Sequence, residues 1–231
     1  MILAACQPAY LPSLSHFARI AASDVFVILD IAEVANGGSV NRARIKTRHG
    51  EQWLTVPLRL VENAKVPVYD IKVDQNQKWQ EEHLRAIEDA YAQSEGRRDR
   101  LEKLSALIRG LDQVWLTPLC RRALNFFLSE YGIATRIQVA PIKKRNPGAT
   151  DLALDLCRDF KADTYLCDAG SRANLDLPRF EQAKVKVVFQ DWQPPVYPQP
   201  DGPFIADLSI VDLWLNTDAN PFTSLVNAHP A

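Results

Sequence analysis

The chain has 231 residues, of which 47% are hydrophobic and 24% are charged, and its formal net charge is −1. This composition is typical of a globular protein with a buried core, and it excludes a general nucleic-acid-binding surface, which would need an excess of Lys and Arg. No apolar run reaches the roughly 20 residues of a membrane-spanning helix, so we expect neither a nucleic-acid nor a membrane partner.

The four cysteines each lie in an apolar segment, and no pair has the spacing of a metal site or a Cys-x-x-Cys motif. Reduced, buried thiols of this kind are typical of cytoplasmic proteins, in which disulfides are rare. We therefore expect a cytoplasmic protein. Cys167 ends a predicted strand and could act as a nucleophile, but its apolar surroundings favour a buried structural thiol.

The first part of the chain has the pattern of a strand at 2–6, a helix at about 13–22 and a second strand at 25–30. Open parallel sheets bind ligands beyond the carboxyl ends of their strands. Both runs end at polar residues, so this region is a predicted binding site. Its candidate residues are Gln7, Tyr10, His16 and Asp30.

Two extended runs, 41–47 and 51–58, flank a short turn with a glycine and predict a β-hairpin. Because side chains alternate along a strand, Arg42, Arg44 and Lys46 share one face. Arginine binds carboxylate and phosphate groups through two parallel hydrogen bonds. We predict that Asn41, Arg42 and Lys46 hold an anionic substrate group, with an exposed hairpin face as the alternative. A further strand is predicted at 68–73.

Helical spacing then dominates the middle of the chain, from about residue 78 to 131. Helices are predicted at 79–93 and 98–109, and a third begins at Thr117, a good N-cap, and stops before Gly132. His83 lies on the apolar stripe of the first helix, so it is either a general base or a packed core histidine.

The last third returns to strand and helix alternation, with strands at 135–141, 164–167 and 185–190. Helices are predicted at 150–160, 177–183 and 209–215. Asp191 stands at the exit of the last strand, where a carboxylate could bind an amine or take a proton. The basic residues 143–145 follow a strand and form a candidate anion site.

These segments together resemble the WbqC-like protein family over nearly the whole chain. The resemblance is carried by many ordered segments and single residues: 7–12, 23–30, 41–47, 50–57, Trp79, His83, Tyr91, 162–166, 189–191, 195–199 and 208–213. The chain departs from the family pattern in two places, at 14–17 and at Cys167 with Asp168. Both departures fall in predicted site loops, so the substrate is expected to differ from the family's usual one.

The resemblance implies a bacterial enzyme of surface-glycan biosynthesis, such as O-antigen, or of secondary metabolism. The implied reaction is amide bond formation, in which a transferase moves an acyl or aminoacyl group to an amine of a small polar acceptor. We keep two alternatives. One is a nucleotidyl or adenylyl transferase, with His16 near nucleotide phosphates at the start of the first helix. The other is a non-catalytic ligand-binding protein.

We therefore predict a single α/β domain over residues 1–231, with a mixed, mainly parallel sheet, a β-hairpin and a helical insertion at about 78–131. The candidate catalytic residues are His83, Asp30 and Asp191. The candidate substrate-binding residues are Gln7, Tyr10, His16, Asn41, Arg42, Lys46, Trp53, Tyr165, Tyr197 and Gln199. The partner is a small-molecule substrate; no metal site is predicted, and cofactor and oligomeric state stay unknown.

Overall fold

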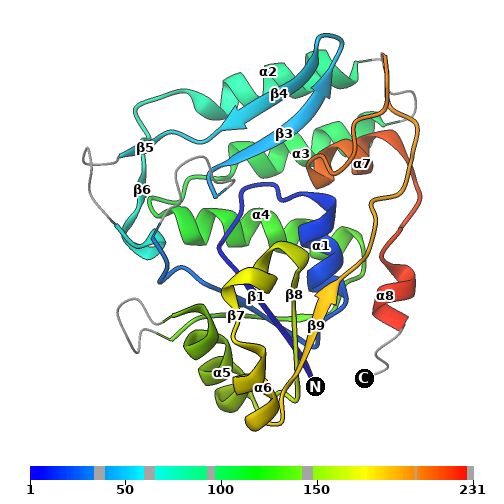
Figure 1. The fold of residues 1–231 in the computed structure, drawn as a ribbon. Coiled ribbons are helices and arrows are strands. Elements are labelled where there is room, and N and C mark those ends of the chain that lie inside the picture. Colours follow the sequence, from blue (N-terminus) through cyan, green and yellow to red (C-terminus); the bar gives the residue numbers. More distant parts are fainter. Residues whose placement is uncertain (34–39, 60–65, 93–96, 142–147, 201, 228–231) are drawn as a thin grey trace.

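A five-stranded parallel sheet with strand order β7-β2-β1-β8-β9 forms the centre of the computed structural model (Figure 1). The register between β1 and β2 pairs Leu3 with Val25, and all four neighbouring strand pairs are parallel. The parallel sheet is therefore confirmed. Its strands are β1 (Ile2–Cys6), β2 (Val25–Ile28), β7 (Arg136–Val139), β8 (Thr164–Asp168) and β9 (Lys186–Gln190).

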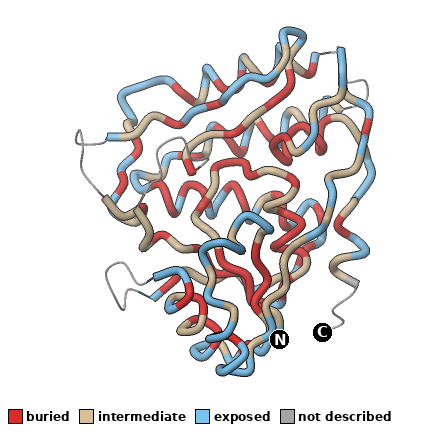
Figure 2. The backbone as a smooth tube through the Cα atoms, in the orientation of Figure 1, coloured by how far each residue is buried: buried red, intermediate tan, exposed pale blue. Residues whose placement is uncertain are grey.

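Each face of the sheet has its own hydrophobic core because side chains alternate along each strand. Leu3, Val25 and Val27 pack toward α5 (Ala149–Phe160) and α6 (Leu177–Gln182). The opposite face packs toward α1 (Leu14–Ala21) and α4 (Leu116–Glu130). The red segments in Figure 2 follow these two layers through the middle of the molecule.

A second β region lies beyond α1 and α4. The predicted hairpin is confirmed as an antiparallel pair that opposes Arg44 and Trp53. It contacts α2 and α7, and its buried side chains join the same core as the sheet face above. The elements of this layer are β3 (Arg42–Thr47), β4 (Gly50–Thr55), α2 (Trp79–Tyr91), α3 (Arg98–Arg109) and α7 (Ile210–Asn216).

Smaller elements connect these layers and complete the fold. The strands β5 and β6 pair antiparallel, and the turn η1 contacts α4. The helix α8 near the end of the chain contacts α1 and was not predicted. Their bounds are β5 (Leu58–Arg59), η1 (Val68–Asp70), β6 (Lys72–Val73), η2 (Ala169–Asn174) and α8 (Thr223–Asn227).

The predicted strand at 68–73 is wrong over its first half, which is the 3-10 turn η1. Backbone contacts from distant segments stabilise the turn: Tyr69 N donates to Asp30 O at 2.9 Å, and Val68 N donates to Ala32 O at 3.0 Å. A strand pattern in sequence carries no information about such contacts. The apolar alternation at Val68, Ile71 and Val73 is real, since all three residues are buried.

The predicted N-cap role of Thr117 is also wrong. The residue that caps α4 is Trp115, and Thr117 is the second residue of the helix. The helix therefore begins two residues earlier than the capping signal indicated, and the Thr117 side chain faces a pocket. In α5 the cap is likewise Gly148 rather than Thr150, whose hydroxyl accepts from Asp176 N at 2.9 Å.

The structure describes residues 1–33, 40–59, 66–92, 97–141, 148–200 and 202–227. The paired glycines at 37–38 and the candidate anion site at 143–145 lie outside these ranges. Of the helices in the described ranges, none combines the length and the apolar character needed to cross a membrane.

Candidate functional site

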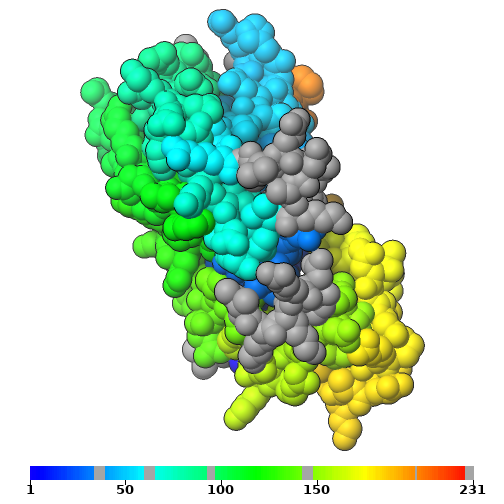
Figure 3. All heavy atoms as spheres, turned by 90° about the vertical axis from the view of Figure 1, so that its left-hand side faces the viewer, coloured from blue at the N-terminus to red at the C-terminus, as the bar shows by residue number. Residues whose placement is uncertain are grey.

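A pocket of about 600 Å³ opens where the carboxyl ends of β2 and β7 meet the first turns of α4. Its floor is Val139 of β7, and Asp30 follows β2 at its edge. Figure 3 looks onto this side of the molecule, where blue atoms of the first third show between cyan and yellow-green parts. The volume lies in the ordinary range for small-molecule sites. The described lining residues are Asp30, Tyr69, Trp115, Thr117, Pro118, Arg121, Arg122, Asn125 and Val139.

Asp30 is the most buried charged group of this pocket, with 6% of its surface exposed. Its backbone is fixed because its carbonyl accepts from Tyr69 N, while Leu29 N donates to Cys6 O at 2.8 Å. The Oδ1 atom has no hydrogen-bond partner among the described residues. Buried carboxylate oxygens are normally satisfied, so this oxygen has hydrogen-bonding capacity left over at the edge of the pocket.

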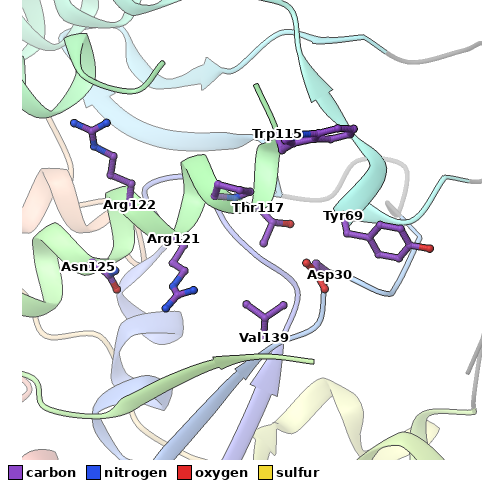
Figure 4. Close-up of a pocket in the computed structure, with 9 residues that line it drawn as sticks. Asp30, Tyr69, Trp115, Thr117, Arg121, Arg122, Asn125 and Val139 are labelled. Atoms are coloured by element: carbon purple, nitrogen blue, oxygen red, sulfur yellow. The ribbon is translucent and has the colours of Figure 1, made fainter. Parts of the chain in front are cut away.

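Burial raises the pKa of Asp30 above its ordinary value, because loss of water disfavours the carboxylate. The nearby Thr117 hydroxyl partly opposes this rise. The Thr117 Oγ1 is buried beside the Asp30 carboxyl, close enough to act on its pKa but without a hydrogen bond of ordinary geometry to a described residue. Two polar groups at the same end of the pocket are thus available to a bound molecule, and Figure 4 shows them facing each other.

The helix α4 presents a polar stripe to the pocket: Thr117, Arg121 and Asn125 all line it. Residues four apart lie on the same helix face, so this spacing places the three side chains in one row. Arg121 makes no ion pair or hydrogen bond with the described residues. Arg122 also lines the pocket, but its Nη1 pairs with Asp112 Oδ1 at 3.4 Å.

His83 lies apart from this pocket, in a buried contact with Tyr10. Its Nε2 lies 3.2 Å from Thr55 O, and its Nδ1 lies 3.0 Å from the Tyr10 hydroxyl. A carbonyl only accepts, so Nε2 carries the proton and Nδ1 accepts from Tyr10. Burial lowers the His83 pKa to about 4. This arrangement favours the structural alternative for both residues.

The candidate binding residues of the hairpin also have their contacts outside the pocket. The Arg42 guanidinium stacks on Trp53 at 4.3 Å from the ring centroid. Asn41 Nδ2 donates to Val56 O at 2.8 Å, across the hairpin end. Lys46 is buried and its Nζ donates to Pro203 O at 2.9 Å, which holds the tail against β3. None of these four residues is among the lining residues described for the pocket.

Asp191 lines a different, mostly apolar pocket between the sheet, α1 and α8. The carboxyl ends of parallel strands open at one edge of a sheet, which predicts one cleft shared by Gln7, Tyr10, Asp30, Arg42 and Asp191. Among the described lining residues of the Asp30 pocket, only Asp30 belongs to this set. The reason is lateral spacing: β9 and β2 are separated by β8 and β1 in the sheet. Gln7 is nearer, and its Nε2 donates to Glu33 O at 2.8 Å in the loop after β2.

His16 is half-buried against the sheet, and Tyr165 packs in the interior. His16 lies against Phe26, with ring centroids 5.4 Å apart, and burial lowers its pKa to about 3. A neutral imidazole lacks the charge that would attract a phosphate. Tyr165 stacks on Phe180 at 5.9 Å in the core beneath α6. Both contacts favour a packing role.

Tyr197 and Gln199 meet at the buried carboxylate of Asp212. The Tyr197 and Tyr91 hydroxyls donate to it at 2.6 and 2.7 Å, and Gln199 Nε2 donates at 2.8 Å. Asp212 has no exposed surface, so these three donors satisfy a charge that would otherwise be costly to bury. The cluster links the tail to α2 and α7 as a structural element.

Two further kinds of functional group remain to be considered, metal ligands and cysteine thiols. The described residues contain no cluster of three metal-ligating side chains. All four cysteines are free thiols, as expected. Burial raises the pKa of Cys167 to about 11, so its thiol is protonated at neutral pH and is a poor nucleophile.

Sequence reasoning predicted Asp30, which lines this pocket, but not the lining residues that α4 and η1 contribute. A usable signal was present: Thr117, Arg121 and Asn125 recur every four residues on a helix whose buried face is apolar. We interpreted Thr117 as a cap and did not follow the stripe. Tyr69 and Trp115 carried no comparable pattern, because only the turn η1 and the start of α4 bring them together.

Comparisons with known proteins agree with the resemblance seen in the sequence. The uncharacterized protein Rv1507c of Mycobacterium tuberculosis is 29% identical over 218 residues, which cover 94% of each chain. No solved structure matches the chain significantly. The model of the WbqC-like protein family matches residues 7–223. With the match extending over nearly all of its length, the chain belongs to the WbqC-like protein family.

Proposed function

We propose that the protein is an enzyme that transfers an acyl or aminoacyl group to the amine of a small polar acceptor, with Asp30 as the base. The observation that supports this most directly is the buried Asp30 carboxyl in the 600 Å³ pocket, whose Oδ1 has no hydrogen-bond partner among the described residues. Membership of the family, with the surface-glycan or secondary-metabolite role that its resemblance implies, supports the same reaction class.

In this reaction the acceptor arrives as an ammonium ion, which an ionised Asp30 attracts. The carboxylate takes a proton, and the free amine attacks the carbonyl carbon of an activated acyl donor, such as a thioester or acyl adenylate. A C–N bond forms, the bond to the leaving group breaks with its electron pair, and the departing group takes the second proton that the nitrogen loses. The raised pKa makes Asp30 a stronger base than a solvated aspartate, and such a base contributes about 10²–10⁴-fold.

The test is a metabolite comparison by mass spectrometry among strains that carry the wild-type gene, a deletion, or Asp30→Asn. We expect an N-acylated product that is present with the wild type and lost in both other strains. The matched control is Asp89→Asn, which neutralises an exposed aspartate of α2 outside this pocket. Unchanged product in the Asp30→Asn strain would contradict the assignment of the base. An Asp191→Asn strain tests the second predicted carboxylate in the same way.

Purified Asp30→Asn protein provides the check on folding. A raised pKa means that the folded state favours the neutral carboxyl, so the charged form lowers stability above the unfolded-state pKa of about 3.9. The amide should therefore keep or raise the melting temperature at neutral pH. A large fall in melting temperature would instead identify Asp30 as a structural residue.

A further inference from the structure

The Asp30 pocket contains two opposite charges that no described residue neutralises. At one end is the buried Asp30 carboxyl, whose Oδ1 has no hydrogen-bond partner. At the other end is the Arg121 guanidinium, which makes no contact with a described acid. Figure 4 shows them on either side of Val139, both beneath the first turns of α4.

The neighbouring arginine provides the contrast. Arg122 also lines the pocket, but Figure 4 shows its guanidinium pointing away from Asp30 and Val139. It pairs with Asp112 at 3.4 Å and lies close to Gly110. Two adjacent residues of one helix therefore differ in whether the fold itself supplies a counter-charge. Only Arg121 is available to an anion inside the pocket.

The charged groups on the two sides of Val139 determine which charges a ligand of this pocket must carry. A guanidinium recognises carboxylate and phosphate oxygens through a fixed fork of donors. A buried carboxylate favours a cation, here the ammonium group of the acceptor. Val139 supplies an apolar floor between the two ends, and Trp115 and Tyr69 supply aromatic rings at the rim. The pocket volume of about 600 Å³ is larger than the two charged groups of a ligand would fill, which leaves room for a frame between them.

We propose that the ligand of this pocket carries an ammonium group, which Asp30 holds, and a carboxylate or phosphate group, which Arg121 holds, on a frame that contains a ring. This inference rests on the proposed function, since it identifies the acceptor class of the same site. Two sources share this chemistry: an aromatic amino acid and a phosphorylated amino sugar. The two sources differ in the distance between their ammonium and anionic groups. A binding experiment that compares them therefore shows which distance fits across Val139.

The test is isothermal titration calorimetry on the full-length protein with four defined probes. Glucosamine 6-phosphate carries both charges and a ring, and phenylalanine carries both charges close together. Glucosamine has only the amine, and glucose 6-phosphate has only the anion. We expect one of the two doubly charged probes to bind at least about tenfold more tightly than either singly charged probe. Whichever of the two binds identifies the source.

Variants of the charged residues test which group of the ligand binds at each end of the pocket. Arg121→Ala should weaken the doubly charged probe about tenfold or more and leave glucosamine unchanged, because glucosamine has no group for the guanidinium. Arg122→Ala should change the affinity of every probe less than about threefold, since its partner is Asp112. Asp30→Asn should weaken every probe that carries an amine and leave glucose 6-phosphate unchanged. Circular dichroism confirms that the variants are folded.

Three results would overturn the inference. One is that neither doubly charged probe binds at about 10 mM. Another is that doubly and singly charged probes bind equally. The third is equal loss from Arg121→Ala and Arg122→Ala. Failure of the proposed function gives a different pattern: the doubly charged probe binds through both ends, but the metabolite comparison shows no product that depends on Asp30.

Discussion

The buried pair of His83 and Tyr10 illustrates how a residue with catalytic chemistry can be used for structure. Both ring nitrogens of His83 are engaged, and Trp79 packs against the imidazole at 5.2 Å between ring centroids. The pair joins α2 to the segment after β1 and to the end of β4. Its neutral form is the one that the contacts require.

We predict that His83 makes the fold sensitive to acid. The folded pKa of about 4 lies below the unfolded value of about 6.5, so the unfolded state binds more protons between these values. Stability is then complete above about pH 6.5 and falls as the pH falls toward 4, by up to about 3 kcal/mol. Urea unfolding of the wild type and His83→Gln across this range measures the effect.

The Gln variant should be less stable at pH 7.5 and should lose much of the pH dependence between 6.5 and 4. Its product level per folded molecule should match the wild type. If His83→Gln instead keeps its stability and abolishes the product, the imidazole is the general base after all. Tyr10→Phe should reproduce part of the destabilisation, about 1–3 kcal/mol, because it leaves Nδ1 unsatisfied.

Among the elements, α4 has the largest part in the candidate site, because its first turns form one wall of the pocket. Its other faces are held by buried residues such as Leu119, Ala123 and Phe127. The helix ends at Glu130, and Gly132 follows with φ of 64°, a left-handed conformation that lets the chain turn toward β7. Ile133 N donates to Leu128 O at 2.9 Å across this turn.

We predict that Gly132→Ala destabilises the protein by about 1–2 kcal/mol, because an L residue is strained at positive φ. A methyl group there would meet no atom within 4 Å, so the cost is in the backbone alone. The control is Gly132→Asn at the same position, since asparagine enters the left-handed conformation at lower cost than alanine. Equal free energies of unfolding for the two variants would contradict this explanation.

In the molecule as a whole, the Asp212 cluster joins segments from distant parts of the sequence. Tyr91 belongs to α2, Asp212 to α7, and Tyr197 and Gln199 to the proline-rich tail. Lys46 adds a second attachment of the same tail to the hairpin. These bonds attach the proline-rich tail to α2, α7 and the hairpin. The residues that they join lie far apart in the sequence, so no local pattern could specify them.

Removal of one donor should measure the strength of this attachment. We predict that Tyr197→Phe costs about 1.5–3 kcal/mol, the usual range for a hydrogen bond to a charged group. Tyr131→Phe is the matched control, because the buried Tyr131 hydroxyl has no partner among the described residues. Its loss should be neutral or stabilising. Chemical denaturation compares the two, and a substrate-binding role of Tyr197 would show as lost binding at unchanged stability.

The sequence alone determined the layers of this protein. Alternation of side chains predicted the hairpin, since one face of Arg42–Thr47 must be apolar to pack on α2. Short apolar runs between helices predicted the parallel sheet, because each strand needs a helical crossover to its parallel neighbour. Asp30 was found for the same reason: it ends a buried strand, and strand ends of parallel sheets share one edge.

Only the tertiary structure decided which polar residues meet Asp30. The order of the strands separates Asp191 from it by two strands and brings β7, from more than 100 residues later, beside β2. The position of α4 then places Arg121 at the pocket and leaves Arg42 on Trp53. Local periodicity fixes the face of an element, but contacts between elements depend on packing of all layers at once, and a sequence pattern carries no such information.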